Sequence, residues 1–373
     1  MTVSTVAPRH GVAQVTALLD LPEVRALIAG LDETRWTGRP GYPVRTMVGV
    51  LLAKSVYALP TWTRTLRLLG EHDALRDAVG GVVPSDDATY RFTAKMREHR
   101  HLLDAALDAV VRAVKDANPD YGIDVALDGS DMAAYSNGHR TLFKNGPVRE
   151  KFADADASWG HRSAVGTRKG GGYFGHKLHA MVCTRTELPI AWTTRTAKDA
   201  EKNEVEGLFD IAARRGVEPA TATLDKGYDA QPIYDLLLAR HVRPVIALVG
   251  TLRVQRGEHK PPTCQHGTWT FAGADDKRQA TQWRCPSRAC KPASVWIKYD
   301  RLHPPIPHGT DRWKAIYRGR TSVERCFGRL KNDAGLTPLR VRGSDRVSLH
   351  TDLTILTTLA AALARARALS VAA

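Results

Sequence analysis

The sequence has little that would direct it to a membrane or out of the cell. No apolar run approaches the roughly 18 to 20 residues that span a bilayer, and the N-terminus lacks a charged start followed by an apolar signal core. Five cysteines, an odd number in a chain of 373 residues, argue against a disulfide framework. With 43% hydrophobic and 25% charged residues, the composition is that of a globular protein. We therefore expect a cytoplasmic protein with no membrane partner.

Acidic residues are scarce relative to basic ones. There are 39 Asp and Glu against 54 Lys and Arg, which gives a net charge of +15 and a sequence pI near 9.8. Such an excess favours a polyanionic partner, and DNA, RNA and anionic membranes all fit it. The basic residues are dispersed along the chain and lie beside no amphipathic membrane anchor. This distribution favours an extended nucleic-acid surface.

Residues 1–118 are predicted to form a helical, DNA-binding N-terminal domain. Apolar residues recur there at spacings of three and four, and Gly and Pro separate the segments. Ser85 or Asp86 could cap a helix over 86–99 that follows a short turn, as the second helix of a helix-turn-helix does. Short paired helices are also common in proteins that never touch DNA, so this pattern leaves both interpretations open.

Beyond residue 118 the pattern changes to β-branched and alternating segments. We expect strands over 123–130, 132–136, 173–183, 188–196, 221–225 and 243–250, with helices over 199–216 and 230–241. This order predicts an α/β core that begins with 119–250. Residues 251–309 break the pattern with Pro, Gly, Cys and three Trp, and we interpret them as a β-rich insertion. Helices over 310–373 complete the core.

Two aspartates end predicted strands. Asp128 follows an apolar run directly before Gly129, and Asp225 ends a second run. Strand ends that open onto loops are where α/β folds keep their sites, although Asp before Gly is also a common turn former. Other aspartates lie nearby, namely Asp124, Asp131 and Asp229. We favour Asp128 and Asp225 because each directly ends its strand.

A polar stripe marks the segment "YRGRTSVERCFGRLK". Its members are Tyr317, Arg320, Glu324 and Lys331, and at helical spacing they fall on one face beside an apolar stripe. The simple alternative is a solvated face of an amphipathic helix. If Glu324 instead joins Asp128 and Asp225, three oxygen ligands suit Mg²⁺ or Mn²⁺ and two-metal phosphodiester chemistry. The neighbouring basic and phenolic groups would then hold a DNA backbone in line.

The motifs together resemble a known family. Tyr317, Arg320, Glu324 and Lys331 match in spacing the Tyr-Arg-Glu-Lys signature of bacterial insertion-sequence transposases of the DDE class. "ALDGS", "GHKLHA" and "TLDKGYDA" are similar to the blocks around their first and second aspartates. "GRPGYPVRTMVGVLLAK" and "PSDDATYRFTAKM" look like their N-terminal domain. The resemblance covers most of the chain.

The resemblance implies a ribonuclease-H-like catalytic core, interrupted by the insertion and preceded by the helical domain. It also implies that Asp128, Asp225 and Glu324 are the catalytic metal ligands. The expected function is to bind the inverted ends of an insertion sequence, cleave them and join them to target DNA, as a homodimer in the end-bound complex. Two alternatives stay open: a DNA-binding regulator that has lost catalysis, and a nuclease of the same fold.

The insertion offers soft metal ligands. Cys264, His266, Cys285 and Cys290 could hold a structural Zn²⁺, or the cysteines could be reduced thiols in a loop-rich subdomain. Trp269, Trp283 and Trp296 are expected to form the small core of this subdomain. In some similar transposases, a Trp of the insertion stacks on a flipped base. The sequence does not say which of the three would do so.

One predicted strand carries basic side chains beside Asp128. His176, Lys177 and His179 share this strand, which suits a role in phosphate binding or around a metal. We assign His176 and Lys177 to DNA binding on this basis. Residues on an edge or solvent face of a sheet would show the same pattern.

Overall fold

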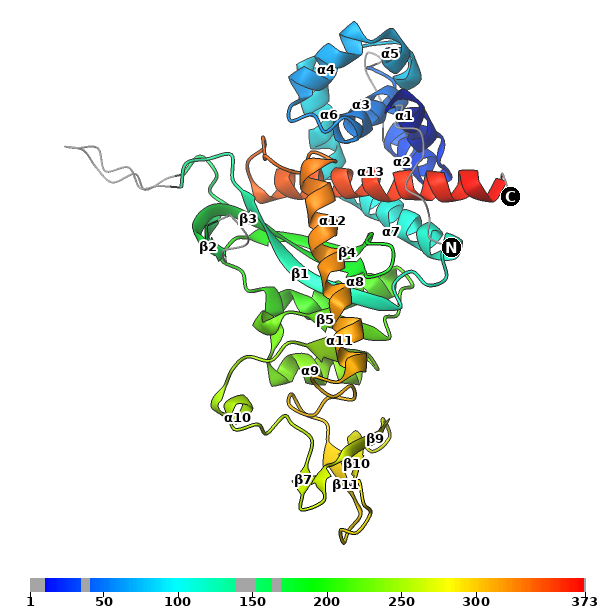
Figure 1. Ribbon diagram of the computed structural model, residues 1–373. Coiled ribbons are helices and arrows are strands. Elements are labelled where there is room, and N and C mark those ends of the chain that lie inside the picture. The colour runs from blue at the N-terminus through cyan, green and yellow to red at the C-terminus, as the bar shows by residue number, and fades with distance from the viewer. Residues whose placement is uncertain (1–10, 35–40, 139–151, 163–168, 372–373) are drawn as a thin grey trace, which may run out of the picture.

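The N-terminal part of the chain is helical, as predicted. The computed structural model describes residues 11–34, 41–138, 152–162 and 169–371 (Figure 1). The helices are α1 (Gly11–Asp20), α2 (Pro22–Glu33), α3 (Val44–Val56), α4 (Trp62–Glu71), α5 (Asp73–Val79), α6 (Asp86–Glu98) and α7 (Arg100–Ala117). The Ser85 side chain accepts a hydrogen bond from the Ala88 N–H at 3.2 Å, which caps α6 and confirms its predicted start.

A mixed sheet forms the centre of the protein. Its strands are β1 (Asp124–Ala133), β2 (Ser158–Arg162), β3 (Gly171–Cys183), β4 (Pro189–Thr196), β5 (Thr221–Leu224) and β6 (Arg243–Ile246). β3 is antiparallel to β1 on one edge and to β2 and β4 on the other, whereas β1, β5 and β6 run parallel. The predicted separate strand over 132–136 was wrong, because β1 continues unbroken to Ala133, and β2 was not predicted.

Helices follow the strands in the expected order. The 3-10 helix η1 (Glu201–Glu204) leads into α8 (Val205–Arg214) after β4, and the 3-10 helix η2 (Lys226–Tyr228) leads toward α9 (Gln231–Ala239) after β5. The predicted helix over 199–216 therefore begins with a tighter turn. The η1 and η2 turns pack against each other beside the carboxyl end of β5.

The segment after β6 forms a small body of its own. It contains α10 (Leu252–Gln255), the short pair β7 (Thr263–Cys264) and β8 (Gly267–Thr268), and a three-stranded sheet of β9 (Thr270–Asp275), β10 (Ala280–Arg284) and β11 (Ser294–Lys298). Figure 1 shows this body at the opposite end of the molecule from the N-terminal helices. Its core is a cluster around Trp269, Trp283 and Cys285, separate from the main core.

The chain returns to the central sheet through α11 (Asp311–Tyr317), the 3-10 helix η3 (Arg318–Arg320) and α12 (Thr321–Asn332). The single helix predicted for this segment is thus interrupted by one tighter turn. In Figure 1, α12 crosses in front of β1 and β3, against which it packs. Its buried residues Val323, Phe327 and Leu330 are the apolar stripe expected from the sequence.

The last helix, α13 (Ser344–Val371), joins the N-terminal helices to the sheet. Asp352 of α13 accepts a hydrogen bond from the indole of Trp192 in β4 at 2.7 Å and pairs with Arg100 of α7. By length and composition, residues 344–370 would suffice to cross a membrane, contrary to our expectation from apolar runs. However, 72% of the apolar stretch is buried inside the protein, so packing in the core accounts for its composition.

Candidate active site

Asp128 and Asp225 lie just beyond the point where the parallel pairing of β1 with β5 ends. Asp225 directly follows β5, but Asp128 lies inside β1, which continues to Ala133, so the expectation that Asp128 ends its strand was wrong. The register pairs Ala126 of β1 with Thr223 of β5, so each aspartate stands two residues beyond a matched pair. The carboxylate of Asp128 accepts from the N–H of Gly129 at 2.8 Å, and that of Asp225 accepts from the N–H of Gly227 at 2.7 Å. The two carboxylates predicted from distant sequence blocks therefore share one edge of the sheet.

The other aspartates near these strands have structural partners. Asp124 accepts from the Thr221 hydroxyl at 2.5 Å, and Asp131 pairs with Arg162 at 3.3 Å. The side chain of Asp229 is fully buried and pairs with Arg301, which ties the small body to the core. Each of the three aspartates therefore has a partner within the fold.

Glu324 is connected to Asp128 through the side chain of Arg320. One guanidinium nitrogen of Arg320 lies 3.3 Å from Asp128 Oδ2, and the other pairs with the carboxylate of Glu324 one turn further along. The side chain of Arg320 is 21% exposed, whereas that of Glu324 is 52% exposed. Arg320 thus links the first aspartate to the glutamate.

Tyr317 and Lys331 are also engaged at this edge. The Tyr317 ring stacks on Trp313 with centroids 4.5 Å apart, and burial raises its pKa. Lys331 Nζ donates to the backbone carbonyl of Asp131 at 2.5 Å and is 19% exposed. Arg320 and Lys331 both contact β1, so these two members of the polar stripe lie against the sheet.

Negative charge is concentrated around Asp128. Burial, and then the neighbouring Glu201 and Asp225 carboxylates, raise the pKa of Asp128 to about 7, against the opposing effects of the Gly129 N–H and Arg320. A carboxyl group crowded by other carboxylates gains most from a nearby cation. The donors are all hard oxygen atoms, which fits Mg²⁺ or Mn²⁺.

Comparison with known proteins decides the family. Residues 122–359 match the family model described as a transposase DDE domain, which covers more than half of the chain. The chain belongs to the DDE transposases. Residues 3–95 match a second family model, described as a transposase domain. No curated protein matches the chain.

One solved structure similar to this transposase is the piggyBac transposase in a synaptic complex with hairpin DNA. The two share 12% sequence identity over 97% of this chain and 76% of that chain, with a TM-score of 0.43. A likeness at this level carries no argument about mechanism.

Sequence reasoning missed one acidic residue beside Asp128. Glu201, the first residue of η1, accepts from Lys177 Nζ at 3.2 Å and is the strongest of the charges that act on Asp128. No pattern around it in the sequence marks it, because it opens an otherwise ordinary amphipathic helix. Lys177 is 13% exposed and faces this carboxylate, so its predicted role in contacting DNA is not supported by its position.

The predicted DNA contact of His176 must be withdrawn. Its side chain is fully buried, and its Nε2 lies 3.1 Å from the equally buried carboxylate of Asp154. His179, two residues along β3, is 1% exposed, and burial lowers its pKa to about 3. In the transposase these histidines lie inside the sheet layer, so neither faces a bound backbone.

The insertion brings three of its four predicted soft ligands together. The sulfur atoms of Cys264, Cys285 and Cys290 all lie within 4.8 Å of one another. A hydrogen bond from the Ser287 hydroxyl lowers the pKa of Cys285 to about 6, and contact with the other thiols raises that of Cys290 to about 12. His266 is not part of the group: its ring is exposed and contacts Gln265. The expected four-ligand set is therefore reduced to three cysteines.

The three insertion tryptophans differ in exposure. Trp269 and Trp283 are 8% and 4% exposed and form the expected small core. Trp296 is 41% exposed, with the Arg278 guanidinium 4.8 Å from its ring centroid, so its predicted place in the core was wrong.

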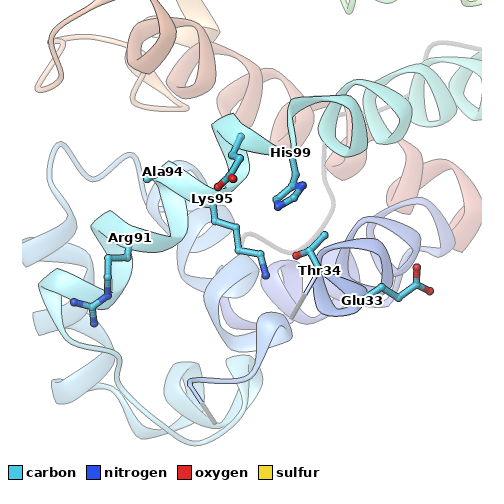
Figure 2. A pocket seen from close by; sticks show the side chains of 7 residues that line it. Glu33, Thr34, Arg91, Ala94, Lys95 and His99 are labelled. Carbon is cyan, nitrogen blue, oxygen red and sulfur yellow. The ribbon is translucent and has the colours of Figure 1, made fainter. Parts of the chain in front are cut away.

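A separate hollow lies among the N-terminal helices. Figure 2 shows side chains from the end of α2 and from α6 around it, and its volume is 710 Å³. Arg91, Lys95 and His99, at four-residue spacing on one helix face, line one side. Lys95 donates to the Leu31 carbonyl at 3.1 Å. This basic face is distant in sequence from the carboxylates, and two of its residues, Arg91 and Lys95, belong to the region that matches the second transposase model.

Proposed function

We propose that this transposase binds the inverted ends of its insertion sequence, cleaves them by two-metal phosphodiester hydrolysis and transfers the strands to target DNA. The observation that carries the proposal is the convergence of Asp128 and Asp225 on one sheet edge, with Glu324 linked to them by Arg320. Such a set suits a DDE transposase, whose substrate is DNA. We place the activity in the bacterial cytoplasm, where this DNA lies.

Asp128, Asp225 and Glu324 would hold the divalent ions. When bound, Mg²⁺ or Mn²⁺ supplies activation of a water or 3′-hydroxyl on one side of the phosphodiester and stabilises the leaving oxygen on the other. The raised pKa of Asp128 supports this assignment, because a crowded carboxyl group is a poor anion without a cation.

The basic and phenolic groups of the stripe would position the DNA. Arg320 can offer its planar guanidinium to a phosphate once cations neutralise Asp128 and Glu324. Lys331 adds a positive charge a few residues further along the same sheet edge, and Tyr317 a hydroxyl group. Their role is to keep the scissile phosphodiester in line with the attacking oxygen.

We further propose a division of labour along the chain. Residues 1–118 would bind end DNA, with the basic face of α6 as one contact surface. Residues 119–250 and 310–373 would form a ribonuclease-H-like core, supported by the order of parallel and antiparallel strands. Residues 251–309 would be an insertion stabilised by Zn²⁺ on three cysteines. A homodimer would hold the two ends together.

The test is cleavage of a labelled transposon end. Asp225→Ala and Glu324→Gln should each abolish cleavage in Mg²⁺. The affinity for end DNA should stay within about threefold of wild type, because these carboxylates would bind the cations and not the DNA. Loss of binding in step with cleavage would contradict the assignment. Incubating pre-cut ends with a plasmid separates a transposase, which gives joined products, from a nuclease, which does not. If the wild-type protein binds transposon ends but does not cut them, the alternative of a DNA-binding regulator without catalysis would be favoured.

A further inference from the structure

Glu201 lies beside Gly129 and Asp128, on a turn that packs near Asp225. It begins η1, and η1 packs against η2, the turn that directly follows Asp225. On the other side, Lys177 of β3 holds its carboxylate at 3.2 Å. The glutamate is 28% exposed, so part of its carboxylate remains open to solvent or a ligand.

Gly129 makes room for this glutamate. A Cβ atom at position 129 would lie 2.6 Å from Glu201 Oε1 and 2.9 Å from its Cγ and Cδ, closer than real atoms approach. The backbone of Gly129 is ordinary strand and has no positive φ, so glycine is not needed there for its conformation. The glycine therefore admits the Glu201 side chain directly beside Asp128.

Negative charge exceeds positive charge around Glu201 and Asp128. Burial raises the pKa of the Tyr228 hydroxyl well above its ordinary value, and the negative charges of Glu201, Asp128 and Asp225 raise it further. The cations that meet them, Lys177 and Arg320, each already pair with a carboxylate. Further positive charge would be favourable here.

We propose that Glu201 is a fourth acidic ligand of the catalytic centre, which binds a divalent cation together with Asp128 and Asp225 and is oriented by Lys177. The inference rests on the proposed function. The glycine keeps the Glu201 carboxylate next to Asp128, because an alanine at 129 would force this side chain to move. If a divalent cation binds at Asp128 and Asp225, the Glu201 carboxylate would replace one of the water molecules that would otherwise complete its coordination.

The experiment is a titration of the DNA-free, full-length transposase with Mn²⁺, in which electron paramagnetic resonance measures the free ion. Glu201→Gln keeps the size of the side chain and an oxygen that can accept from Lys177, but it removes the charge. We expect it to weaken Mn²⁺ binding by about 10-fold or more. Gly129→Ala, which displaces the side chain, should weaken binding similarly.

Glu204→Gln is the matched control. Glu204 lies on the same turn and pairs with Arg195 at 3.1 Å, away from Asp128. It should leave Mn²⁺ affinity within about twofold, and thermal unfolding in EDTA should show that all variants fold. If Glu201→Gln lowers stability in EDTA but leaves Mn²⁺ affinity unchanged, Glu201 is only a counterion and the inference fails. If wild type binds Mn²⁺ but Asp225→Ala still cleaves ends, the proposed function fails instead.

Discussion

Arg320 donates to Asp128 across 192 residues of sequence, with Nη1 3.3 Å from Oδ2. The same guanidinium pairs with Glu324. It therefore lies between two of the carboxylates that we propose as cation ligands. If cations neutralised these carboxylates, the guanidinium would be free to pair with a DNA phosphate.

Replacing Arg320 tests this positioning role. Arg320→Lys keeps the charge but loses the planar fork, so single-turnover cleavage of a labelled end at saturating protein should fall about 100-fold, and end binding should change little. Arg320→Ala should lower the cleavage rate further than Arg320→Lys does. Lys314→Ala removes an exposed charge paired only with Asp311 and should change the rate less than about twofold. Equal, small losses for Arg320→Lys and Lys314→Ala would mean that the stripe is a solvated face.

Metal binding should depend on pH through Asp128. Its pKa of about 7 means that the carboxyl group is largely protonated at pH 6, and a divalent cation must displace that proton. Mn²⁺ affinity should therefore rise from pH 5.5 to about 7.5 and then level off. Calorimetry in two buffers of different ionisation enthalpy should detect a released proton at pH 6 and little release at pH 8. A pH-independent affinity would contradict this.

The same raised pKa predicts the stability of the metal-free protein. A carboxyl group whose pKa is higher in the folded state than its usual 3.8 favours folding at low pH, and this contribution is lost as pH rises through about 7. In EDTA, the melting temperature should thus fall between pH 5.5 and 7.5 by an amount that Asp128→Asn reduces. An equal decrease in melting temperature in wild type and Asp128→Asn would mean that groups other than Asp128 cause it.

The cysteine group of the insertion should bind zinc. We expect about one zinc per chain in protein purified without chelators, because three thiolates within 4.8 Å suit a tetrahedral ion and the apolar core there is small. Cys285→Ser should release the metal and make residues 251–309 more sensitive to proteolysis. His266→Ala should retain it. If metal analysis finds no zinc in the wild-type protein, the prediction of a zinc site at these cysteines is wrong.

Trp296 is the insertion residue suited to stacking on a base. Its ring is 41% exposed on β11 beside Arg278, whereas Trp269 and Trp283 are buried. Trp296→Ala should reduce the fluorescence change of 2-aminopurine placed at the transposon end, since a stacked base contributes about 1 to 3 kcal/mol. Trp296→Phe, which keeps a ring, should preserve most of the change. An unaltered signal in Trp296→Ala would exclude this residue.

The sequence by itself determined the features that arise from neighbouring residues. The apolar runs before Asp128 and Asp225 predicted strands at β1 and β5, although β1 continues past Asp128, and helical spacing predicted the buried face of α12. Ser85 was predicted as a cap because a cap bonds to a backbone N–H only three residues away. Patterns that depend only on residues a few positions apart are the same in any fold that contains the helix or strand.

Only the tertiary structure decided which distant side chains meet. Glu201 comes beside Asp128 because η1 packs on η2 and Gly129 leaves space, and none of these contacts has a local signature. His176 looked like Lys177 in the strand pattern, but the two point to opposite faces, and its face lies against Asp154. His266, two residues from Cys264, remains outside the thiol group. Register and packing between elements fix these outcomes, and a single sequence records them only indirectly.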